Sequence, residues 1–226
     1  MHLFSKEHNF LGGHGIVGGH VPIATGVAFA IKYRGGDQVI LCFMGEAAVN
    51  NGAFHEALNM AALWKLPVIY IIENNRYGMG TALERASAIN DIAERANAYD
   101  MPRAVLDGQD VLAVRAGIAE AVERARRDSI PTLVEVRTYR FMGHSMSDAV
   151  SGTYRTKAEL DEYLKRDPIT LLRATMQENG ELSEEEVAKM DEEIKAIVQD
   201  AWDFADASPE PPLEALYEDV LVDTTS

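Results

Sequence analysis

Short apolar runs alternate with segments of helical spacing along the first two thirds of the chain. The runs are rich in β-branched and aromatic residues, which predicts strands at Val39–Phe43, Val68–Ile72, Met101–Leu106 and Thr132–Arg137. Helices are predicted before and between them, at Val21–Tyr33, Asn50–Trp64, Asp91–Tyr99 and after Asp110. Strands that alternate with helices indicate an α/β fold with a doubly wound parallel sheet between two layers of helices.

The stretch from Val39 to Asn75 predicts a βαβ unit. Two continuous apolar strands joined by a helix should be parallel, covered on both faces and connected by a right-handed crossover. Glu46 follows the first strand, and Asn74 and Asn75 follow the second. Since neighbouring parallel strands end at the same edge of a sheet, we expect these residues to meet where open α/β folds bind ligands.

These polar residues are compatible with a cation site or with ordinary turns. An acid and an amide beside a helix N-terminus suit Mg²⁺ that carries a phosphate, because the helix end attracts the anion and the oxygens hold the metal. In the alternative, Glu46 is an exposed acid in the first turn of a helix, and Asn74 and Asn75 are turn residues. The residues alone leave both interpretations open.

A glycine-rich loop, LGGHGIVGGH, precedes the first predicted helix. Gly13, Gly15 and Gly18 spell G-x-G-x-x-G, and Asp37 lies about twenty residues further on, as in a dinucleotide-binding fingerprint. The context argues against that interpretation, because no good strand precedes the loop and Asp37 comes before a strand instead of ending one. The hypothesis that the chain is a nicotinamide-binding oxidoreductase therefore rests on this spacing alone.

A long loop, YRFMGHSMSDAVSGTYRT, follows the last predicted strand. It is too long and too rich in glycine and serine for a simple connection, which favours a functional loop. Arg140 supplies paired donors suited to a phosphate, and His144 can gain or lose a proton near neutral pH. The alternative is a loop that carries a solvated histidine.

Composition narrows the classes of function. A chain of 226 residues can hold one α/β domain with an appendage. The formal net charge of −15 argues against nucleic-acid binding, and no apolar run reaches the length of a membrane-spanning helix. The single cysteine, Cys42, lies inside a predicted strand, which predicts a buried, inert thiol and fits a reducing compartment.

From Lys157 the composition changes to charged helices. Ser183 and Glu186 predict a capping box at the start of a helix with one apolar face. Prolines at 209, 211 and 212 end this helix. We therefore expect an α/β domain at residues 1–156 and a C-terminal helical extension of the same domain at residues 157–226.

The stretch GEAAVNNGAFHEALNMAALWKLPVIYIIENNRYGMGT resembles the metal and diphosphate motif of thiamine-diphosphate enzymes. Together with the GHSMSD loop, this stretch is similar to the alpha subunits of 2-oxo acid dehydrogenases. Its sequence most resembles the alpha subunits of pyruvate dehydrogenase. The similarity extends from MHLF to SPEPP. It implies a three-layer αβα thiamine-diphosphate-binding fold, thiamine diphosphate and Mg²⁺ as cofactors, and a 2-oxo acid substrate. It also implies a beta subunit in an alpha2-beta2 heterotetramer and a lipoyl acyltransferase component as partners.

The resemblance also assigns roles by position. Mg²⁺ binding falls to Glu46, Asn75 and the carbonyl of Tyr77. Cofactor binding falls to residues of the glycine loop, the first strand end and the long loop: Gly15, Val17, Ala47, Ala48, Asn75, Arg140 and His144. His144 and Ser145 are the catalytic candidates, and His144 would orient or protonate groups near the reacting carbon.

The chain departs from the pattern of the family at several positions. Glu46 stands where the motif has Asp, and its additional methylene adds about 1.5 Å of reach, although Mg²⁺ requires close octahedral geometry. Ala47 stands where the motif has Gly and adds a Cβ, and Met142 replaces a usual histidine. Met1 aligns with an interior position of the family, so we expect a truncated chain.

The implied reaction is decarboxylation of a 2-oxo acid, most simply pyruvate, with transfer of the acyl group to a lipoyl carrier. We expect the chain to be inactive without its beta subunit, which would supply the acid that activates the cofactor. The alternatives are the alpha subunit of an acetoin or branched-chain 2-oxo acid dehydrogenase, and a truncated, cofactor-poor relative that acts as an assembly subunit. The expected location is the bacterial cytoplasm, or the mitochondrial matrix if a missing N-terminal segment carried a transit peptide.

Overall fold

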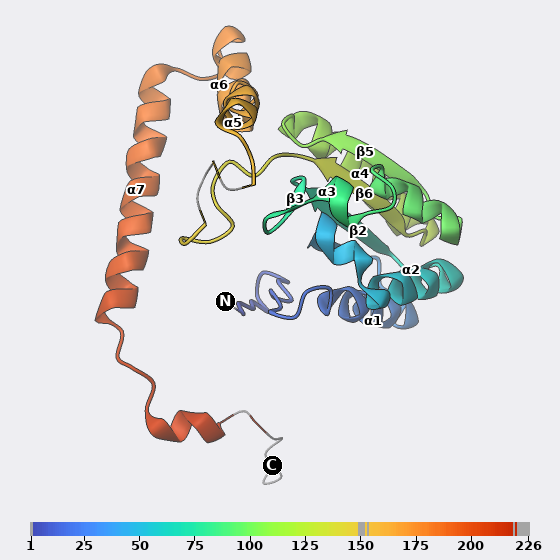
Figure 1. Cartoon of the computed structure of the whole chain (residues 1–226). Coiled ribbons are helices and arrows are strands. Elements are labelled where there is room, and N and C mark those ends of the chain that lie inside the picture. The colour runs from blue at the N-terminus through green and yellow to red at the C-terminus, as the bar shows by residue number, and fades with distance from the viewer. Residues whose placement is uncertain (1, 149–151, 153, 219, 221–226) are drawn as a thin grey trace. The chain divides into compact units, whose positions relative to one another are not determined.

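Four parallel strands form the sheet that organises the chain (Figure 1). Their order in the sheet is β1-β2-β6-β5. The computed structural model describes residues 2–148, 152, 154–218 and 220. The strands are β1 (Ile40–Gly45), β2 (Val68–Asn74), β5 (Arg103–Asp107) and β6 (Thr132–Arg137). All three pairings are parallel, and Gly45 of β1 lies opposite Glu73 of β2. The predicted parallel sheet is confirmed.

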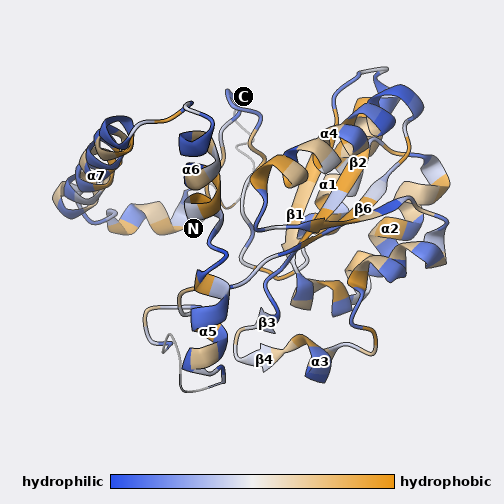
Figure 2. Ribbon diagram, turned by 90° about the horizontal axis from the view of Figure 1, so that it is seen from above, coloured by the Kyte–Doolittle hydropathy of each residue, from blue (hydrophilic) through white to orange (hydrophobic). Residues whose placement is uncertain are grey.

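Helices cover both faces of the sheet, which gives the predicted three layers (Figure 1). On one face, α1 (His20–Tyr33) and α2 (Gly52–Trp64) enclose a core with Tyr70 and Ile72 of β2. On the other face, α4 (Val111–Asp128) packs against Ile69, Ile71 and Val134. Figure 2 shows the strands as hydrophobic ribbons between helices of mixed hydropathy. Alternate residues of β2 are thus buried in two separate cores, as expected for a strand covered on both sides.

Two predicted helices differ in detail from the structure. The segment after β1 is a 3₁₀ helix, η1 (Glu46–Asn50), and α2 starts only at Gly52, with Asn51 as its N-cap. The segment predicted at Asp91–Tyr99 is also a 3₁₀ helix, η2 (Ile92–Tyr99). Spacing of apolar residues identifies a helical segment, but it does not separate short 3₁₀ turns from α-helix.

Asp110 caps α4 with its side chain. Its carboxylate accepts hydrogen bonds from the backbone N–H groups of Leu112 and Ala113, both at 3.0 Å. We expect Asp110→Ala to lower the free energy of unfolding by about 1 kcal/mol, because two N–H groups of the first turn lose their acceptor. Chemical denaturation measures the loss, and Asp110→Asn, which keeps an acceptor oxygen, is the control. Equal losses in the two variants would contradict the role of the cap.

The chain divides into two compact units, Met1–Leu172 and Arg173–Ser226. Besides the sheet, the first unit contains the small hairpin β3 (Tyr77–Gly78) and β4 (Thr81–Ala82), followed by the short helix α3 (Leu83–Ala86). It also contains α5 (Lys157–Leu164), which was predicted to belong to the C-terminal extension. The helix α6 (Pro168–Glu178) begins in the first unit and ends in the second. The boundary of the extension at residue 156 stays a prediction.

The second unit is helical and acidic. Its long helix α7 (Glu184–Ala207) begins with the predicted capping box, in which Ser183 and Glu186 exchange hydrogen bonds. A 3₁₀ helix, η3 (Leu213–Tyr217), follows the prolines. The basic residues in this part of the sequence are Arg173, Lys189 and Lys195, and acidic residues far outnumber them. Among the described residues, no helix has the length and apolar character that crossing a lipid bilayer requires.

Candidate cation and diphosphate site

The ends of β1 and β2 bring Glu46 and Asn75 together. Glu46 opens η1 directly after β1, and its side chain is buried, with only 2% of the residue surface exposed. Its Oε2 accepts a hydrogen bond from the backbone N–H of Asn75, at 3.2 Å. Glu46 is therefore not the exposed helix-start acid of the alternative interpretation. The predicted convergence at the carboxyl edge of the sheet is present, while the role of these residues in metal binding stays a prediction.

The turn after β2 holds the other two predicted ligands close to each other. The Oδ1 atom of Asn75 accepts a hydrogen bond from the N–H of Tyr77, at 3.3 Å. Two residues of the turn have left-handed backbone conformations without being glycine: Arg76 has φ +75° and Met79 has φ +54°. Such conformations cost on the order of 1–3 kcal/mol each when their surroundings must enforce them, and they cluster at functional sites. The surrounding hydrogen bonds therefore hold this turn in shape.

Arg140 anchors the long loop to the same turn. Its guanidinium donates to the carbonyl oxygens of Tyr77, at 2.7 Å, and Met79, at 2.9 Å. Arg140 is the predicted diphosphate ligand, and the Tyr77 carbonyl is a predicted Mg²⁺ ligand. Two of the five N–H donors of Arg140 are directed at backbone carbonyls, one of which is the predicted metal ligand, and the diphosphate role of Arg140 stays a prediction. A carbonyl oxygen has two lone pairs, so it can accept from Arg140 and still face a cation.

Burial raises the pKa of the Glu46 carboxyl, and three neighbours act against that shift. Its own backbone N–H, the N–H of Asn75 and the positive charge of Arg140 each favour the carboxylate. A divalent cation beside Glu46 would favour the carboxylate more strongly. Carboxylate, amide and carbonyl oxygens from Glu46, Asn75 and Tyr77 form an all-oxygen donor set, which is the type that Mg²⁺ prefers. The residues present thus fit a magnesium ion in chemical type.

Ala47 packs directly against the turn. A Cβ added at Gly78 would lie 2.6 Å from the Cβ of Ala47, which is too close for two carbon atoms. We expect Gly78→Ala to lower the free energy of unfolding by about 1–3 kcal/mol through overpacking. Adding Ala47→Gly should recover most of that loss.

Thermal or urea denaturation of the single and double variants tests this packing. Gly52→Ala is the control, because no atom lies within 4 Å of an added Cβ there. If Gly78→Ala behaved like Gly52→Ala, the contact between Ala47 and residue 78 would not be tight.

Ala48, the neighbouring cofactor candidate, is buried in the core on the α1 and α2 side.

The glycine loop is tied to the start of α2. The backbone carbonyl of Val17 accepts a hydrogen bond from the side-chain amide of Asn51, at 3.0 Å. Gly18 has φ +80°, and an added Cβ would lie 3.2 Å from the same amide, so glycine is required there. The backbone N–H of Gly15 donates to Nε2 of His2, at 2.8 Å. Asn51 thus joins the loop to the element that follows Glu46, although the predicted cofactor contacts of Gly15 and Val17 stay predictions.

His144 and Ser145 lie on an exposed part of the long loop. The N–H of His144 donates to the carboxylate of Asp148, at 2.9 Å, and the hydroxyls of Ser145 and Ser147 lie 3.0 Å apart. Tyr154 also donates to Asp148, at 2.7 Å. In the described part of the loop, which excludes residues 149–151 and 153, no hydrogen bond joins the His144 or Ser145 side chain to Glu46 or Asn75. Their catalytic roles stay predictions.

Glu135, which lies in the middle of β6, was not among the predicted site residues. Glu135 is fully buried, and its carboxylate accepts hydrogen bonds from Asn74 at 2.8 Å, Arg137 at 3.0 Å and the N–H of Ala93 at 3.0 Å. Burial acts to raise the pKa of Glu135, but these three donors outweigh burial and lower it. The signal in the sequence was an acid inside the apolar run TLVEVR.

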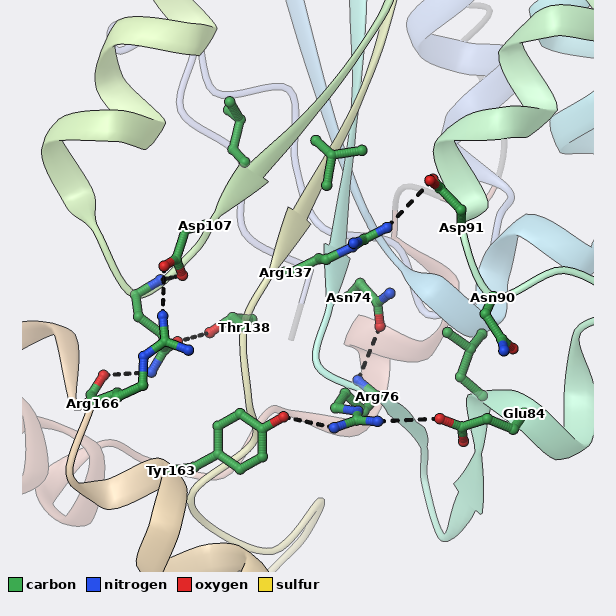
Figure 3. Close-up of a pocket in the computed structure, with 14 residues that line it drawn as sticks. Asn74, Arg76, Glu84, Asn90, Asp91, Asp107, Arg137, Thr138, Tyr163 and Arg166 are labelled. Carbon is green, nitrogen blue, oxygen red and sulfur yellow. Dashed lines mark hydrogen bonds and ion pairs between the residues drawn. The ribbon is translucent and has the colours of Figure 1, made fainter.

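A polar cleft of about 740 Å³, which no sequence pattern predicted, opens beside this edge of the sheet (Figure 3). Its lining includes three arginines, and each of them has an acidic partner. The pairs are Arg76 with Glu84 at 3.2 Å, Arg137 with Asp91 at 3.4 Å, and Arg166 with Asp107 at 2.6 Å. Because these charges compensate each other, the cleft does not form a strong site for an anion.

Comparisons with known proteins extend over nearly the whole chain. Residues 1–214 match the family described as "Dehydrogenase E1 component". The chain is 48% identical over 223 residues to the pyruvate dehydrogenase E1 component subunit alpha of Rhizobium meliloti, which covers 98% of this chain and 64% of that protein. It is 45% identical over 222 residues to the same subunit of Rickettsia bellii, with coverage of 98% and 68%.

A plant protein gives a similar result. The chain is 45% identical over 229 residues to the chloroplastic pyruvate dehydrogenase E1 component subunit alpha-3 of Arabidopsis thaliana, with coverage of 99% of this chain and 53% of that protein. The chain thus spans between 53% and 68% of the length of these relatives. The family match and these identities confirm the resemblance found in the sequence. This chain belongs to the dehydrogenase E1 component family.

Proposed function

We propose that this chain acts as the alpha subunit, or the cofactor-binding part of one, of a thiamine-diphosphate-dependent 2-oxo acid dehydrogenase that acts on pyruvate. The observation that carries the proposal is the cluster of Glu46, Asn75 and Tyr77 at the ends of β1 and β2, in which two hydrogen bonds link the three residues. The relatives named above are pyruvate dehydrogenase subunits, which favours pyruvate over other 2-oxo acids. We also propose a beta subunit and a lipoyl acyltransferase as partners.

In this proposal each residue has a limited physical task. Glu46, the Asn75 side chain and the Tyr77 carbonyl would hold Mg²⁺, and the metal would hold the diphosphate of the cofactor. Thiamine diphosphate, when bound, supplies the electron sink that decarboxylation of a 2-oxo acid needs. Arg140 would remain on the turn and supply positive charge beside the diphosphate. His144, on the exposed loop, would hold or move a proton at the reacting end of the cofactor.

Calorimetric titration tests the proposal directly. Thiamine diphosphate and Mg²⁺ are titrated into the chain alone and into the chain mixed with a pyruvate dehydrogenase beta subunit. We expect saturable binding that requires the metal, and pyruvate decarboxylation only when the beta subunit is present. Titration with NAD is the control for the glycine pattern and should give no heat. Binding of NAD in place of thiamine diphosphate would overturn the proposal.

Two observations favour a second candidate, a relative that assembles with partners but binds the cofactor poorly. Arg140 already donates to the Tyr77 carbonyl at 2.7 Å, and Ala47 fills the space beside Gly78. If these contacts persist, the positive charge of Arg140 opposes a cation at the same oxygen. No heat of thiamine diphosphate binding in either titration, together with a stable complex with the beta subunit, would support this candidate.

A further inference from the structure

We propose that Glu135 and Asn74 are positioning residues for the cation site. The buried Glu135 carboxylate determines which end of the Asn74 amide faces the turn, and that amide fixes the backbone that presents Asn75 and Tyr77. The proposal rests on the proposed function for the identity of the cation site. It assigns no contact with the metal or the cofactor to either residue.

The first step is the orientation of the Asn74 amide. Asn74 is 5% exposed, and its Nδ2 donates to Oε1 of Glu135 at 2.8 Å. An ionised carboxylate only accepts hydrogen bonds, so the amide must direct its NH₂ group at Glu135. The Ala93 N–H and the Arg137 guanidinium also donate to this carboxylate, from two other elements. Glu135 thus selects one of the two possible orientations of the amide.

The second step is the turn itself. With its NH₂ group directed at Glu135, Asn74 directs Oδ1 at the backbone N–H of Arg76, at 3.1 Å (Figure 3). Arg76 has the left-handed conformation of φ +75°, which a non-glycine residue adopts only when its surroundings hold it there. Arg76 lies between the predicted ligands Asn75 and Tyr77, so its backbone conformation sets the directions of both.

The turn has further support from the long loop and from α5. Arg140 holds the carbonyls of Tyr77 and Met79 from the long loop, and the Arg76 side chain contacts Tyr163 at 2.6 Å. These contacts involve side chains that are partly exposed. Glu135 and Asn74 form the buried support. The Glu135 carboxylate can only accept hydrogen bonds, so Asn74 must be the donor. Exchanging donor and acceptor between the two residues is therefore the sharpest test.

The test exchanges donor and acceptor between the two residues. In Glu135→Gln, one acceptor oxygen remains for the donors of Asn74, Arg137 and Ala93, so the new NH₂ group faces either the NH₂ group of Asn74 or the Ala93 N–H. In Asn74→Asp, two carboxylates face each other. In the double variant Asn74→Asp with Glu135→Gln, the amide donates to the new carboxylate, whose other oxygen accepts from Arg76. The formal charge of the pair is then the same as in the wild type.

Two measurements are made on each variant. Hydrogen exchange of the Arg76 and Tyr77 amides by NMR reports the turn without any ligand, and we expect about tenfold faster exchange in Asn74→Asp and a smaller increase in Glu135→Gln. Calorimetry with Mg²⁺ and thiamine diphosphate reports the site, and we expect the affinity to fall about tenfold or more in Asn74→Asp and by less in Glu135→Gln. The double variant should recover most of both quantities.

Val134→Ala is the matched control. It lies beside Glu135 on β6 and is equally buried, but it belongs to the separate core on the α4 side. It should destabilise the chain while leaving the exchange of the Arg76 amide and the affinity for Mg²⁺ unchanged. Asn74→Ala replaces the single variants if one of them fails to fold, because it removes the acceptor of the Arg76 N–H without placing two like groups together.

The outcomes separate this inference from the proposed function. Faster exchange in the single variants with recovery in the double variant supports positioning of the turn. Unchanged exchange, or no recovery in the double variant, overturns the inference even if the wild type binds thiamine diphosphate. Absence of cofactor binding by the wild type, with and without a beta subunit, overturns the proposed function and the link from this turn to a cation site.

Discussion

Glu46→Gln is expected to remove metal-dependent binding of thiamine diphosphate and, at the same time, to raise the temperature at which the first unit unfolds. The loss of a negatively charged ligand should lower the affinity for Mg²⁺ by about 100-fold or more, since even residues behind a metal ligand contribute about tenfold to 100-fold. The hydrogen bond from the Asn75 N–H should persist, because the glutamine Oε1 can accept it.

The gain in stability follows from the direction of the pKa shift. Burial, the largest influence on Glu46, raises its pKa in the folded chain above the ordinary glutamate value. The folded state therefore binds the proton more tightly than the unfolded state. The contribution of Glu46 to stability falls as the pH rises from the ordinary glutamate pKa through the raised pKa of the folded state. At neutral pH the buried charge opposes folding, and glutamine removes that opposition.

Calorimetry at several Mg²⁺ concentrations and thermal denaturation at several pH values measure the two effects. Glu56→Gln, which removes an exposed acid from α2, is the control and should change neither quantity. Glu46→Asp restores the residue that the motif usually has and should keep the binding. If Glu46→Gln bound Mg²⁺ and thiamine diphosphate as tightly as the wild type, Glu46 would not be a metal ligand.

Glu135→Ala is expected to cost about 3–5 kcal/mol of the free energy of unfolding. The substitution leaves the buried Asn74 amide and the Ala93 N–H without their acceptor and opens a cavity in the centre of the sheet. Urea denaturation at neutral pH measures the loss. A loss no larger than that of an exposed acid such as Glu123, on α4, would show that the buried hydrogen bonds contribute little.

The pH dependence of Glu135 has the opposite sign to that of Glu46. The hydrogen bonds from Arg137, Asn74 and Ala93 lower the folded pKa of Glu135, although burial acts against them. Its stabilising contribution is therefore present above the ordinary glutamate pKa and is lost as the pH falls toward the lowered value. Acid titration of stability should show a smaller decrease in Glu135→Gln than in the wild type, because glutamine has no carboxyl group to protonate.

The sheet was predictable because its signal is local. Each of the runs at β1, β2 and β6 contains enough consecutive apolar residues to predict a strand, and the helical spacing between them gives the crossovers. The meeting of Glu46 and Asn75 followed from topology alone, since adjacent parallel strands must end at one edge. The hairpin of β3 and β4 was missed because strands of two residues are too short to show alternation.

The rest of the site depends on contacts between distant residues. The burial of Glu135 is explained by Asn74 and Ala93, which lie far away in the sequence and follow no pattern with it. The position of Arg140 depends on the left-handed turn at Arg76 and Met79, and neither residue type predicts such a turn. Sequence patterns identify which residues lie at the edge of the sheet. The hydrogen-bond partners of these residues depend on the tertiary structure.

The division at Leu172 gives each unit its own fluorophore. The chain has two tryptophans, and Trp64 closes α2 in the first unit while Trp202 lies on α7 in the second. Trp64 packs against Phe29, with the ring centres 5.4 Å apart, so its emission should shift to longer wavelength when α1 and α2 separate. Replacing Trp202 by phenylalanine would leave Trp64 as the only tryptophan, so that intrinsic emission follows the melting of the first unit.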